Sequence, residues 1–187
     1  MIRYATIGTN FVVNWFLEAA KKCEGLHYCA AYSRNVEKAR EYAAQWGADR
    51  YTDSLTELAE AEDVDAVYIA SPNSLHFEQA ALMLTHGKHV LCEKTVTSNR
   101  RELERLLEIA DEKGLVFMEA MRSAFIPAFG LIGDNLNKLG TIRRVSLQYA
   151  KYSSRYDKFR AGVVENAFDP RFSNGALMDI GVYCVHM

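Results

Sequence analysis

Short apolar runs alternate with longer amphipathic stretches along the first two thirds of the chain. The apolar runs predict strands at residues 2–7, 26–32, 50–52, 66–70, 88–92 and 115–120. The stretches between them have the apolar period of helices and lie at residues 12–23, 36–46, 54–61, 74–86 and 98–113. Regular strand–helix alternation is typical of a parallel sheet covered by helices on both faces. The sequence therefore predicts an α/β fold with a doubly wound parallel sheet.

The clearest helical pattern is the one at residues 98–113. Ser98 can cap this helix, Glu102 lies in its early turns, and Gly114 can end it. Its apolar stripe consists of Leu103, Leu106, Leu107 and Ala110. We expect this stripe to face the sheet.

The pattern changes after Ala120. Residues 127–138 have the pattern of a helix, residues 141–150 alternate polar and apolar as in a half-exposed strand, and residues 176–186 have the pattern of another helix. One long strand with so few helices cannot bury a sheet face, and its edges would stay unpaired. We expect a first domain at residues 1–122 and an incomplete α/β second domain at residues 123–187.

Composition excludes several classes of function. The formal net charge of −2 provides no basic field for nucleic acid or for an anionic membrane surface. No apolar run reaches the roughly 18 residues of a membrane-spanning helix. The cysteines are scattered, without a C-x-x-C pair, and neither they nor the histidines show metal-ligand spacing. We therefore expect a cytoplasmic protein with reduced thiols and no metal site.

A glycine turn joins the first predicted strand to the first predicted helix. Gly8, Thr9, Asn10 and Phe11 form this turn, where a dinucleotide pyrophosphate would meet free backbone N–H groups and the positive end of the helix dipole. Asn10 and Val13 replace the second and third glycines of the G-x-G-x-x-G fingerprint. Asn10 can keep the turn because asparagine tolerates a positive φ. A plain strand–helix turn without a ligand is the alternative.

The end of the second predicted strand bears on the choice of cofactor. An NAD site usually has an acidic residue here for the ribose 2′-hydroxyl, but no acid lies between Glu24 and Glu37. Ser33 and Arg34 instead provide a hydroxyl and a guanidinium, which suit a 2′-phosphate. NADP is therefore favoured and NAD remains possible. The alternative is that Arg34 lies on a solvated loop.

The fourth predicted strand leads into a small polar loop. Ser71, Pro72 and Asn73 follow the strand, so the backbone can pass close to a ligand. His76 would lie in the first turn of the next helix. A structural hydrogen-bonding role for His76 is as plausible as a role at the cofactor.

Lys94 follows the fifth predicted strand, within the run Gly87–Lys94. Ligands of open α/β sheets bind at the carboxyl ends of the strands. An amine in such a crevice can take part in proton transfer. The alternative is a solvated lysine on a loop.

Three segments resemble the Gfo/Idh/MocA oxidoreductases. They are AVYIASPNSLH at Ala66–His76, GKHVLCEK at Gly87–Lys94 and GALMDIGVYCVH at Gly175–His186. The resemblance covers essentially the whole chain. It implies an NAD(P)-binding Rossmann domain at residues 1–122. It also implies that residues 123–187 are the truncated start of a substrate and dimerisation domain, so that a homo-oligomer is expected when that domain is complete.

The resemblance also implies roles for particular residues. Lys94 matches the lysine of the family's Glu-Lys-Pro motif, which places Glu93 and Lys94 at the cofactor. Asp179 matches the acid of the helix that borders the pocket, and Tyr183 falls where relatives carry a catalytic His or Tyr. Asp179 and Tyr183 are four residues apart, so a regular helix would place them on one face. A packing role for Tyr183 is the alternative.

One departure concerns Thr95, which stands where the family usually has proline. A cis peptide bond after Lys94 is therefore expected to be lost.

The expected function is NADP(H)-dependent hydride transfer to or from a sugar, polyol or related diol or carbonyl compound. Lys94, Tyr183 and Asp179 would be the catalytic residues. The alternatives are a non-catalytic NAD(P)-sensing protein and an inactive remnant of the family.

Overall fold

The computed structural model describes all of residues 1–187 and divides into two compact units, Met1–Glu119 and Ala120–Met187. The first unit contains a six-stranded parallel sheet with the order β3-β2-β1-β4-β5-β6. Its strands are β1 (Ile2–Ile7), β2 (Leu26–Tyr32), β3 (Arg50–Thr52), β4 (Ala66–Ile69), β5 (His89–Glu93) and β6 (Phe117–Ala120), whose last residue belongs to the second unit. The strand order reverses its direction between β1 and β4, the pattern of a doubly wound sheet.

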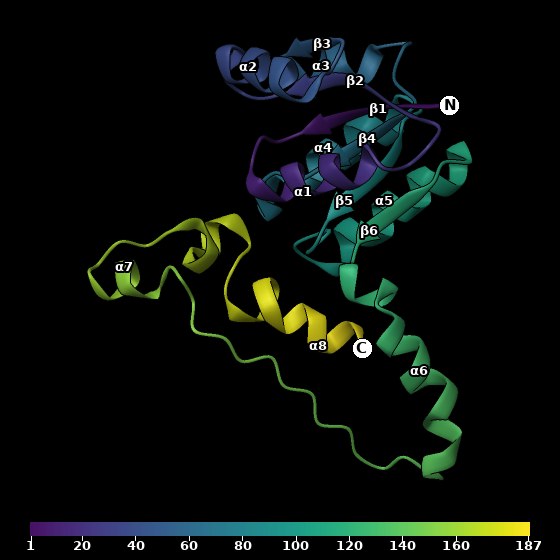
Figure 1. Cartoon of the computed structure of the whole chain (residues 1–187), viewed down its shortest axis with the longest axis vertical. Coiled ribbons are helices and arrows are strands. Elements are labelled where there is room, and N and C mark those ends of the chain that lie inside the picture. The colour runs from purple at the N-terminus through teal and green to yellow at the C-terminus, as the bar shows by residue number, and fades with distance from the viewer. The chain divides into compact units, whose positions relative to one another are not determined.

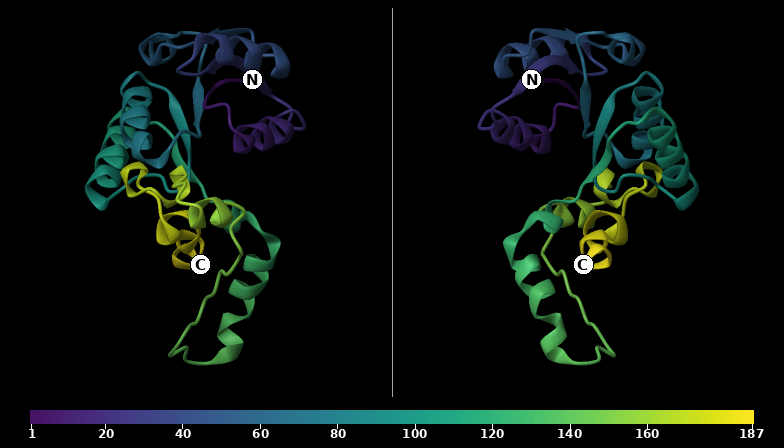
Figure 2. Two further views of the ribbon diagram at one scale, coloured as in Figure 1. Left: turned by 90° about the vertical axis from the view of Figure 1, so that its left-hand side faces the viewer. Right: turned by 90° about the vertical axis from the view of Figure 1, so that its right-hand side faces the viewer.

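Helices cover both faces of this sheet. They are α1 (Phe11–Ala20), α2 (Val36–Trp46), α3 (Leu55–Glu60), the short 3₁₀ turn η1 (Asn73–Leu75), α4 (His76–Thr85) and α5 (Arg100–Lys113). Figure 1 labels these elements, and Figure 2 shows α1 in purple on one face with α4 and α5 in teal on the other. The predicted α/β fold class is therefore confirmed.

The two faces of the sheet are packed differently. On the α4 and α5 side, an aliphatic core joins side chains such as Ile7, Ile69, Met83 and Leu106, each 1% exposed or less. On the α1 side, aromatic rings pack beside the buried aliphatic side chains Val13 and Leu17. Phe16 of α1 stacks on Tyr68 of β4 with ring centroids 4.0 Å apart, and Tyr4 of β1 meets Phe16 edge-on at 5.7 Å. This aromatic contact holds α1, and with it the Gly8 turn, against the sheet.

The predicted elements of the first unit agree with the observed ones, with small differences at their ends. The main correction concerns the start of α5, where the cap is Asn99 and not Ser98. The Asn99 Oδ1 accepts a hydrogen bond from the Glu102 N–H at 3.1 Å, whereas the Ser98 N–H donates to the Glu102 carboxylate at 2.8 Å. Gly114 ends the helix with φ at +65°, as predicted.

Beyond Ala120, the second unit contains only helical segments and irregular chain. Its elements are η2 (Arg122–Phe125), α6 (Pro127–Asn135), η3 (Leu136–Leu139), α7 (Tyr156–Arg160), η4 (Asn166–Phe168), η5 (Pro170–Phe172), the π-helical η6 (Leu177–Gly181) and α8 (Val182–His186). The helix predicted at 127–138 is found as α6 and η3, and the one predicted at 176–186 as η6 and α8.

The strand predicted at residues 141–150 is wrong. These residues form no strand and are all exposed. A strand needs a neighbouring strand for its backbone N–H and C=O groups, and the second unit contains no other strand.

No helix of the structure combines the length and the apolar character needed to cross a membrane.

Candidate cofactor-binding site

A groove of about 260 Å³ lies at the carboxyl ends of β1, β2 and β4, where the strand order reverses. It is lined by Ile7, Gly8, Thr9, Asn10, Tyr32, Ser33, Arg34, Asn35, Lys38, Ala70, Ser71, Pro72, Leu75 and Gln79. All of these residues belong to the first unit. A crevice at this point of an open α/β sheet is where such folds bind ligands.

Gly8 allows the ends of three strands to approach one another. Its φ is +118°, and a Cβ atom built there would lie 2.7 Å from the Ala70 carbonyl oxygen. Its N–H also donates to the Tyr32 carbonyl oxygen at 3.3 Å. Only glycine satisfies both the conformation and the close approach.

Asn10 caps α1 with its side chain. Its Oδ1 accepts hydrogen bonds from the N–H groups of Val12 (2.9 Å) and Val13 (3.4 Å), and its Nδ2 donates to the Ala70 carbonyl oxygen at 2.6 Å. Its φ is −92°, so the expectation that Asn10 keeps the turn through a positive φ is wrong. Asn10 therefore stabilises the turn as the cap of α1. Its side chain accepts from the N–H groups of Val12 and Val13 and does not use the Phe11 N–H.

The far side of the groove is positively charged. Arg34 and Lys38 are exposed and line it together with Ser33, and none of the lining residues is acidic. Asn35 caps α2 by accepting from the Lys38 N–H at 2.9 Å, which fixes the start of this helix beside the groove. Lys38 was not predicted from the sequence. Its position three residues after the capping Asn35 is the signal that could have revealed it.

The loop after β4 forms the third wall. The Ser71 hydroxyl donates to Gln79 Oε1 at 2.7 Å, so a side chain of α4 holds the loop in place. Pro72 lines the groove, whereas Asn73 lies in the following turn η1 and is not among the lining residues.

His76 connects this loop to the segment after β5. Its ring is fully buried, with Nε2 2.9 Å from the Ser71 carbonyl oxygen and Nδ1 2.9 Å from the Thr95 carbonyl oxygen. Burial lowers the pKa of His76, and the two carbonyl contacts oppose this lowering. In this structure His76 is a structural link between two loops.

Lys94 is half-buried and directly follows the last residue of β5. The peptide bond between Lys94 and Thr95 is cis, so the expectation that the cis bond is lost without proline is wrong. Hydrogen bonds fix the following peptide group, between Thr95 and Val96. Its carbonyl oxygen contacts the His76 ring, and its N–H donates to Glu119 Oε1 at 2.9 Å. The surrounding structure, rather than a proline ring, therefore fixes the chain after Lys94.

Glu93 has a buried hydrogen-bonding partner. The Tyr68 hydroxyl donates to its Oε1 at 2.7 Å, and the Lys94 N–H donates to its Oε2 at 3.3 Å. Burial raises the pKa of Glu93, while these two donors act in the opposite direction. Tyr68 is the ring that stacks on Phe16, so the carboxyl beside Lys94 is tied to α1 through two aromatic side chains.

The groove brings together about half of the residues expected at the cofactor. Those that line it are Gly8, Thr9, Asn10, Ser33, Arg34, Ser71 and Pro72. Those that belong to the first unit without lining the groove are Phe11, Asn73, His76, Glu93 and Lys94. Asp179 and Tyr183 belong to the second unit.

Asp179 and Tyr183 lie on different kinds of helix. Asp179 is in the π-helical η6, and Tyr183 is in α8, where its ring stacks on Tyr149 with centroids 5.8 Å apart. The aromatic contact gives Tyr183 a packing partner within its own unit.

Fold and groove together define a Rossmann-type nucleotide-binding α/β protein. Residues 2–121 match the family described as an oxidoreductase family with an NAD-binding Rossmann fold. The chain therefore belongs to the Gfo/Idh/MocA family of oxidoreductases.

Named relatives support this membership. Over 186 residues the chain is 52% identical to the scyllo-inositol 2-dehydrogenase (NADP(+)) IolU of Bacillus subtilis, covering 100% of this chain and 57% of that protein. It is 32% identical over 158 residues to the trans-1,2-dihydrobenzene-1,2-diol dehydrogenase of Bos taurus, covering 83% of this chain and 45% of that protein. The chain thus spans about half the length of these curated relatives.

A solved structure is also similar to this chain in sequence and fold. KijD10, a 3-ketoreductase from Actinomadura kijaniata in complex with NADP and TDP-benzene, matches with a TM-score of 0.68 and 33% identity. The match covers 73% of this chain and 42% of that one.

Proposed function

We propose that the protein is an NADP(H)-dependent oxidoreductase that transfers a hydride between the nicotinamide and a CH–OH carbon of a sugar, a polyol or a related diol or carbonyl compound. The observation that carries this proposal is the groove at the switch point of the sheet, whose lining contains Arg34 and Lys38 but no carboxylate. The similarity to IolU, which is named as NADP-dependent and as acting on scyllo-inositol, supports both the cofactor and a cyclic polyol as the substrate class.

The residues present fit a dinucleotide with a 2′-phosphate. Gly8 and Thr9 line the groove and lead directly into α1, so a pyrophosphate can approach the backbone at the start of this helix. Ser33, Arg34 and Lys38 would hold the 2′-phosphate, because a hydroxyl and two cations match its charge and its acceptor oxygens. An acidic side chain, which would repel that phosphate, is not part of this wall.

The chemistry would be divided between cofactor and chain. The nicotinamide would supply the group that accepts or donates the hydride. Lys94 Nζ and the Tyr183 hydroxyl would hydrogen-bond the reacting oxygen of the substrate and carry its proton. Asp179 would orient Lys94 or a neighbouring substrate hydroxyl.

Two further aspects belong to this proposal. We expect a cytoplasmic enzyme whose partners are its cofactor, a small-molecule substrate and further copies of itself. The named relatives act on small molecules, which supports the substrate class. A native mass measurement tests the self-association, with a strictly monomeric protein as the contrary result.

The experiment that tests the cofactor is a titration of the protein with NADPH and with NADH, followed by nicotinamide fluorescence. We expect NADPH to bind at least about tenfold more tightly, because charge-assisted hydrogen bonds to the 2′-phosphate contribute roughly 1.5–3 kcal/mol. Arg34→Ser should remove most of this difference and leave NADH binding nearly unchanged. Arg101→Ser, at an exposed position of α5, is the matched control.

The experiment that tests the reaction is turnover of NADP⁺ with a panel of inositols, sugars and cyclic diols. Oxidation of at least one cyclic polyol supports the proposal. Tight NADPH binding without turnover across the panel would instead favour a cofactor-sensing protein. Absence of binding to either nucleotide would refute the proposed function.

A further inference from the structure

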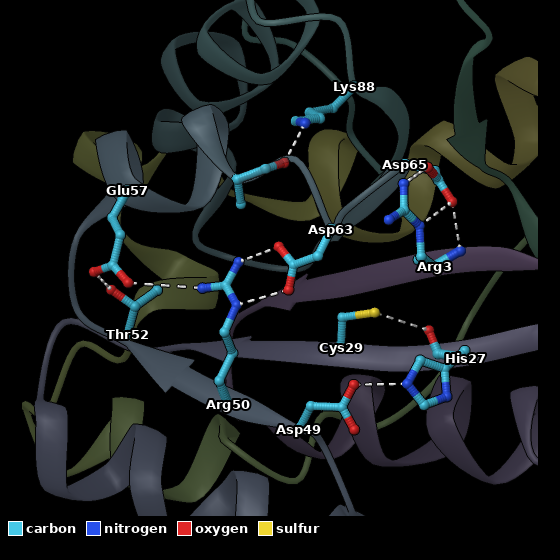
Figure 3. A network of polar contacts seen from close by, with 11 residues as sticks. Arg3, His27, Cys29, Asp49, Arg50, Thr52, Glu57, Asp63, Asp65 and Lys88 are labelled. Atoms are coloured by element: carbon cyan, nitrogen blue, oxygen red, sulfur yellow. Dashed lines mark hydrogen bonds and ion pairs between the residues drawn. The ribbon is translucent and has the colours of Figure 1, made fainter.

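The edge of the sheet where the strands begin carries a network of charged side chains, shown in Figure 3. Arg3, at the start of β1, pairs with Asp65 at 2.6 Å, and Arg50, at the start of β3, pairs with Asp63 at 2.9 Å. This edge is opposite to the one that carries the groove, because parallel strands all begin on one side and end on the other.

Asp49 differs from the other carboxylates of the network. Asp63 and Asp65 are each paired with an arginine, and Glu57 contacts Arg50, whereas the partner of Asp49 is the His27 ring. The Asp49 Oδ2 lies 2.6 Å from His27 Nε2. No permanent cation therefore neutralises this carboxylate directly.

Cys29 completes a group of three different donor atoms. Its Sγ, a ring nitrogen of His27 and a carboxylate oxygen of Asp49 all lie within 4.8 Å of one another. Cys29 lies where the register of β2 against β1 shifts, between the pairs Tyr4–Tyr28 and Ala5–Ala30, and its thiol donates to the His27 carbonyl oxygen at 3.8 Å. Asp49 precedes β3, and its N–H donates to the Tyr28 carbonyl oxygen at 3.3 Å, which fixes it beside the two β2 residues.

This donor set matches the ligands that zinc prefers in proteins. Imidazole nitrogen, thiolate sulfur and carboxylate oxygen bind Zn²⁺ at roughly 2.0–2.3 Å in a tetrahedron, which sets the donor atoms roughly 3.3–3.6 Å apart. The His27 and Asp49 side chains are 42% and 56% exposed, so they can move by the small distance required. Cys29 is only 2% exposed, so the surrounding side chains hold its Sγ donor atom in place.

The charges of the network also favour a cation. The labelled side chains in Figure 3 include the cations Arg3, Arg50 and Lys88 and the carboxylates Asp49, Glu57, Asp63 and Asp65. With His27 and Cys29 neutral, one negative charge is left over. A divalent ion that displaces the thiol proton to solvent adds one positive charge and brings the network to neutrality.

We propose that His27, Cys29 and Asp49 form a zinc site with a water molecule as the fourth ligand. The site links β2 to β3, which has only three residues and lies at the edge of the sheet. Cys29 and Asp49 lie 20 positions apart in the sequence, so the ligands form no spacing motif, which is why the sequence predicts no metal site.

Titration of the protein with Co²⁺, after removal of adventitious metal with a chelator, tests this proposal. We expect one equivalent to bind with the absorption bands of four-coordinate cobalt and a thiolate-to-cobalt charge-transfer band, and Zn²⁺ to displace it. Cys29→Ser should abolish the charge-transfer band. Cys23→Ser, which removes an exposed thiol, should leave the band unchanged and is the matched control.

Because Cys29 is buried, its variant could fail to fold, so two variants of exposed ligands complete the test. His27→Gln and Asp49→Asn should each weaken Co²⁺ binding at least about tenfold, while His86→Gln should not. The proposal is refuted if no saturable charge-transfer band appears, if the band persists in Cys29→Ser, or if both His27→Gln and Asp49→Asn bind Co²⁺ as the unchanged chain does.

Discussion

Lys94 is the residue whose replacement tests the proposed chemistry most directly. Lys94→Met removes the ammonium but keeps an unbranched side chain of similar length. We expect turnover to fall by about 100-fold or more, because a positioned proton-transfer group contributes on this scale. NADPH affinity should change little. The measurements are steady-state kinetics and the fluorescence titration, with Lys22→Met, at an exposed position, as the control.

A Lys94→Met variant with unchanged turnover would remove Lys94 from the mechanism. A variant that lost NADPH binding and turnover together would instead assign Lys94 to cofactor binding.

His76 provides a pH-dependent contribution to stability. Burial holds its pKa below the ordinary value of 6.5, so the unfolded chain takes up a proton at a higher pH than the folded chain. The contribution is therefore fully present above about pH 6.5 and is lost as the pH falls below it. Urea unfolding at about pH 7.5 and about pH 5.5 should show this loss in the unchanged chain and a smaller loss in His76→Gln. His86→Gln should behave like the unchanged chain, and an equal loss in all three proteins would contradict the assignment.

The sequence predicted the residue types of the groove better than their roles. Gly8, Ser33 and Arg34 could be found because they directly follow strands, and position along a parallel strand determines the edge at which a side chain lies. Asn10 was identified for the wrong reason, since it acts as a helix cap rather than through a left-handed conformation. Lys38 was missed because its place depends on how α2 starts. The cis bond after Lys94 was missed because the chain there is fixed by contacts from residues far along the sequence.

At the scale of elements, the junction between β1 and α1 depends on Gly8. Gly8→Ala forces a left-handed φ on a residue with a Cβ and brings that atom to 2.7 Å from the Ala70 carbonyl oxygen. We expect a loss of about 2 kcal/mol or more in the free energy of unfolding. Gly87→Ala is the matched control, because its φ is +78° but no atom lies within 4 Å of the added Cβ. It should cost only about 1 kcal/mol. Equal losses in urea unfolding would show that the close approach to Ala70 is unimportant.

The start of α5 offers a second test at this scale. Asn99→Ala removes the side chain that accepts from the Glu102 N–H and should cost about 1 kcal/mol. Ser98→Ala should cost less than Asn99→Ala, because the Glu102 N–H donates to the Asn99 side chain and not to Ser98. Thermal or urea unfolding distinguishes the two. A larger loss of stability for Ser98→Ala than for Asn99→Ala would instead assign the cap to Ser98, as the sequence predicted.

Elements could be predicted where local pattern and tertiary partner agree. The strands of the first unit are flanked by other strands, so their apolar runs become buried. Residues 141–150 have an equally good strand pattern, but no neighbouring strand exists in the second unit to accept their backbone hydrogen bonds. Polar–apolar alternation shows that a segment favours the extended conformation, but a strand forms only where a neighbouring strand pairs with its backbone.

At the scale of the whole molecule, the groove is built by one unit alone. Its lining residues run from Ile7 to Gln79, so all of them come from the first half of the chain. We therefore propose that residues 1–122 form the NAD(P)-binding domain. Residues 123–187 would then belong to a domain that contributes to substrate binding and self-association.

This division predicts the behaviour of a shortened chain. Residues 1–122 alone should unfold cooperatively and bind NADPH with an affinity close to that of the whole chain, because the groove needs nothing from the second unit. They should have no turnover, because Asp179 and Tyr183 are missing. Urea unfolding and the fluorescence titration are the measurements. A fragment that folds but does not bind NADPH would show that the second unit contributes to the cofactor site.

The reversal of strand order between β1 and β4 has a consequence for the history of such proteins. The crevice follows from the path of the backbone, whereas under the proposed function the preference for one nucleotide over another would depend on a few exposed side chains at its rim, Arg34 and Lys38 among them. These positions can be exchanged without disturbing the interior. Descendants of one ancestor can therefore switch between the two pyridine nucleotides in a few mutational steps while the architecture is inherited intact.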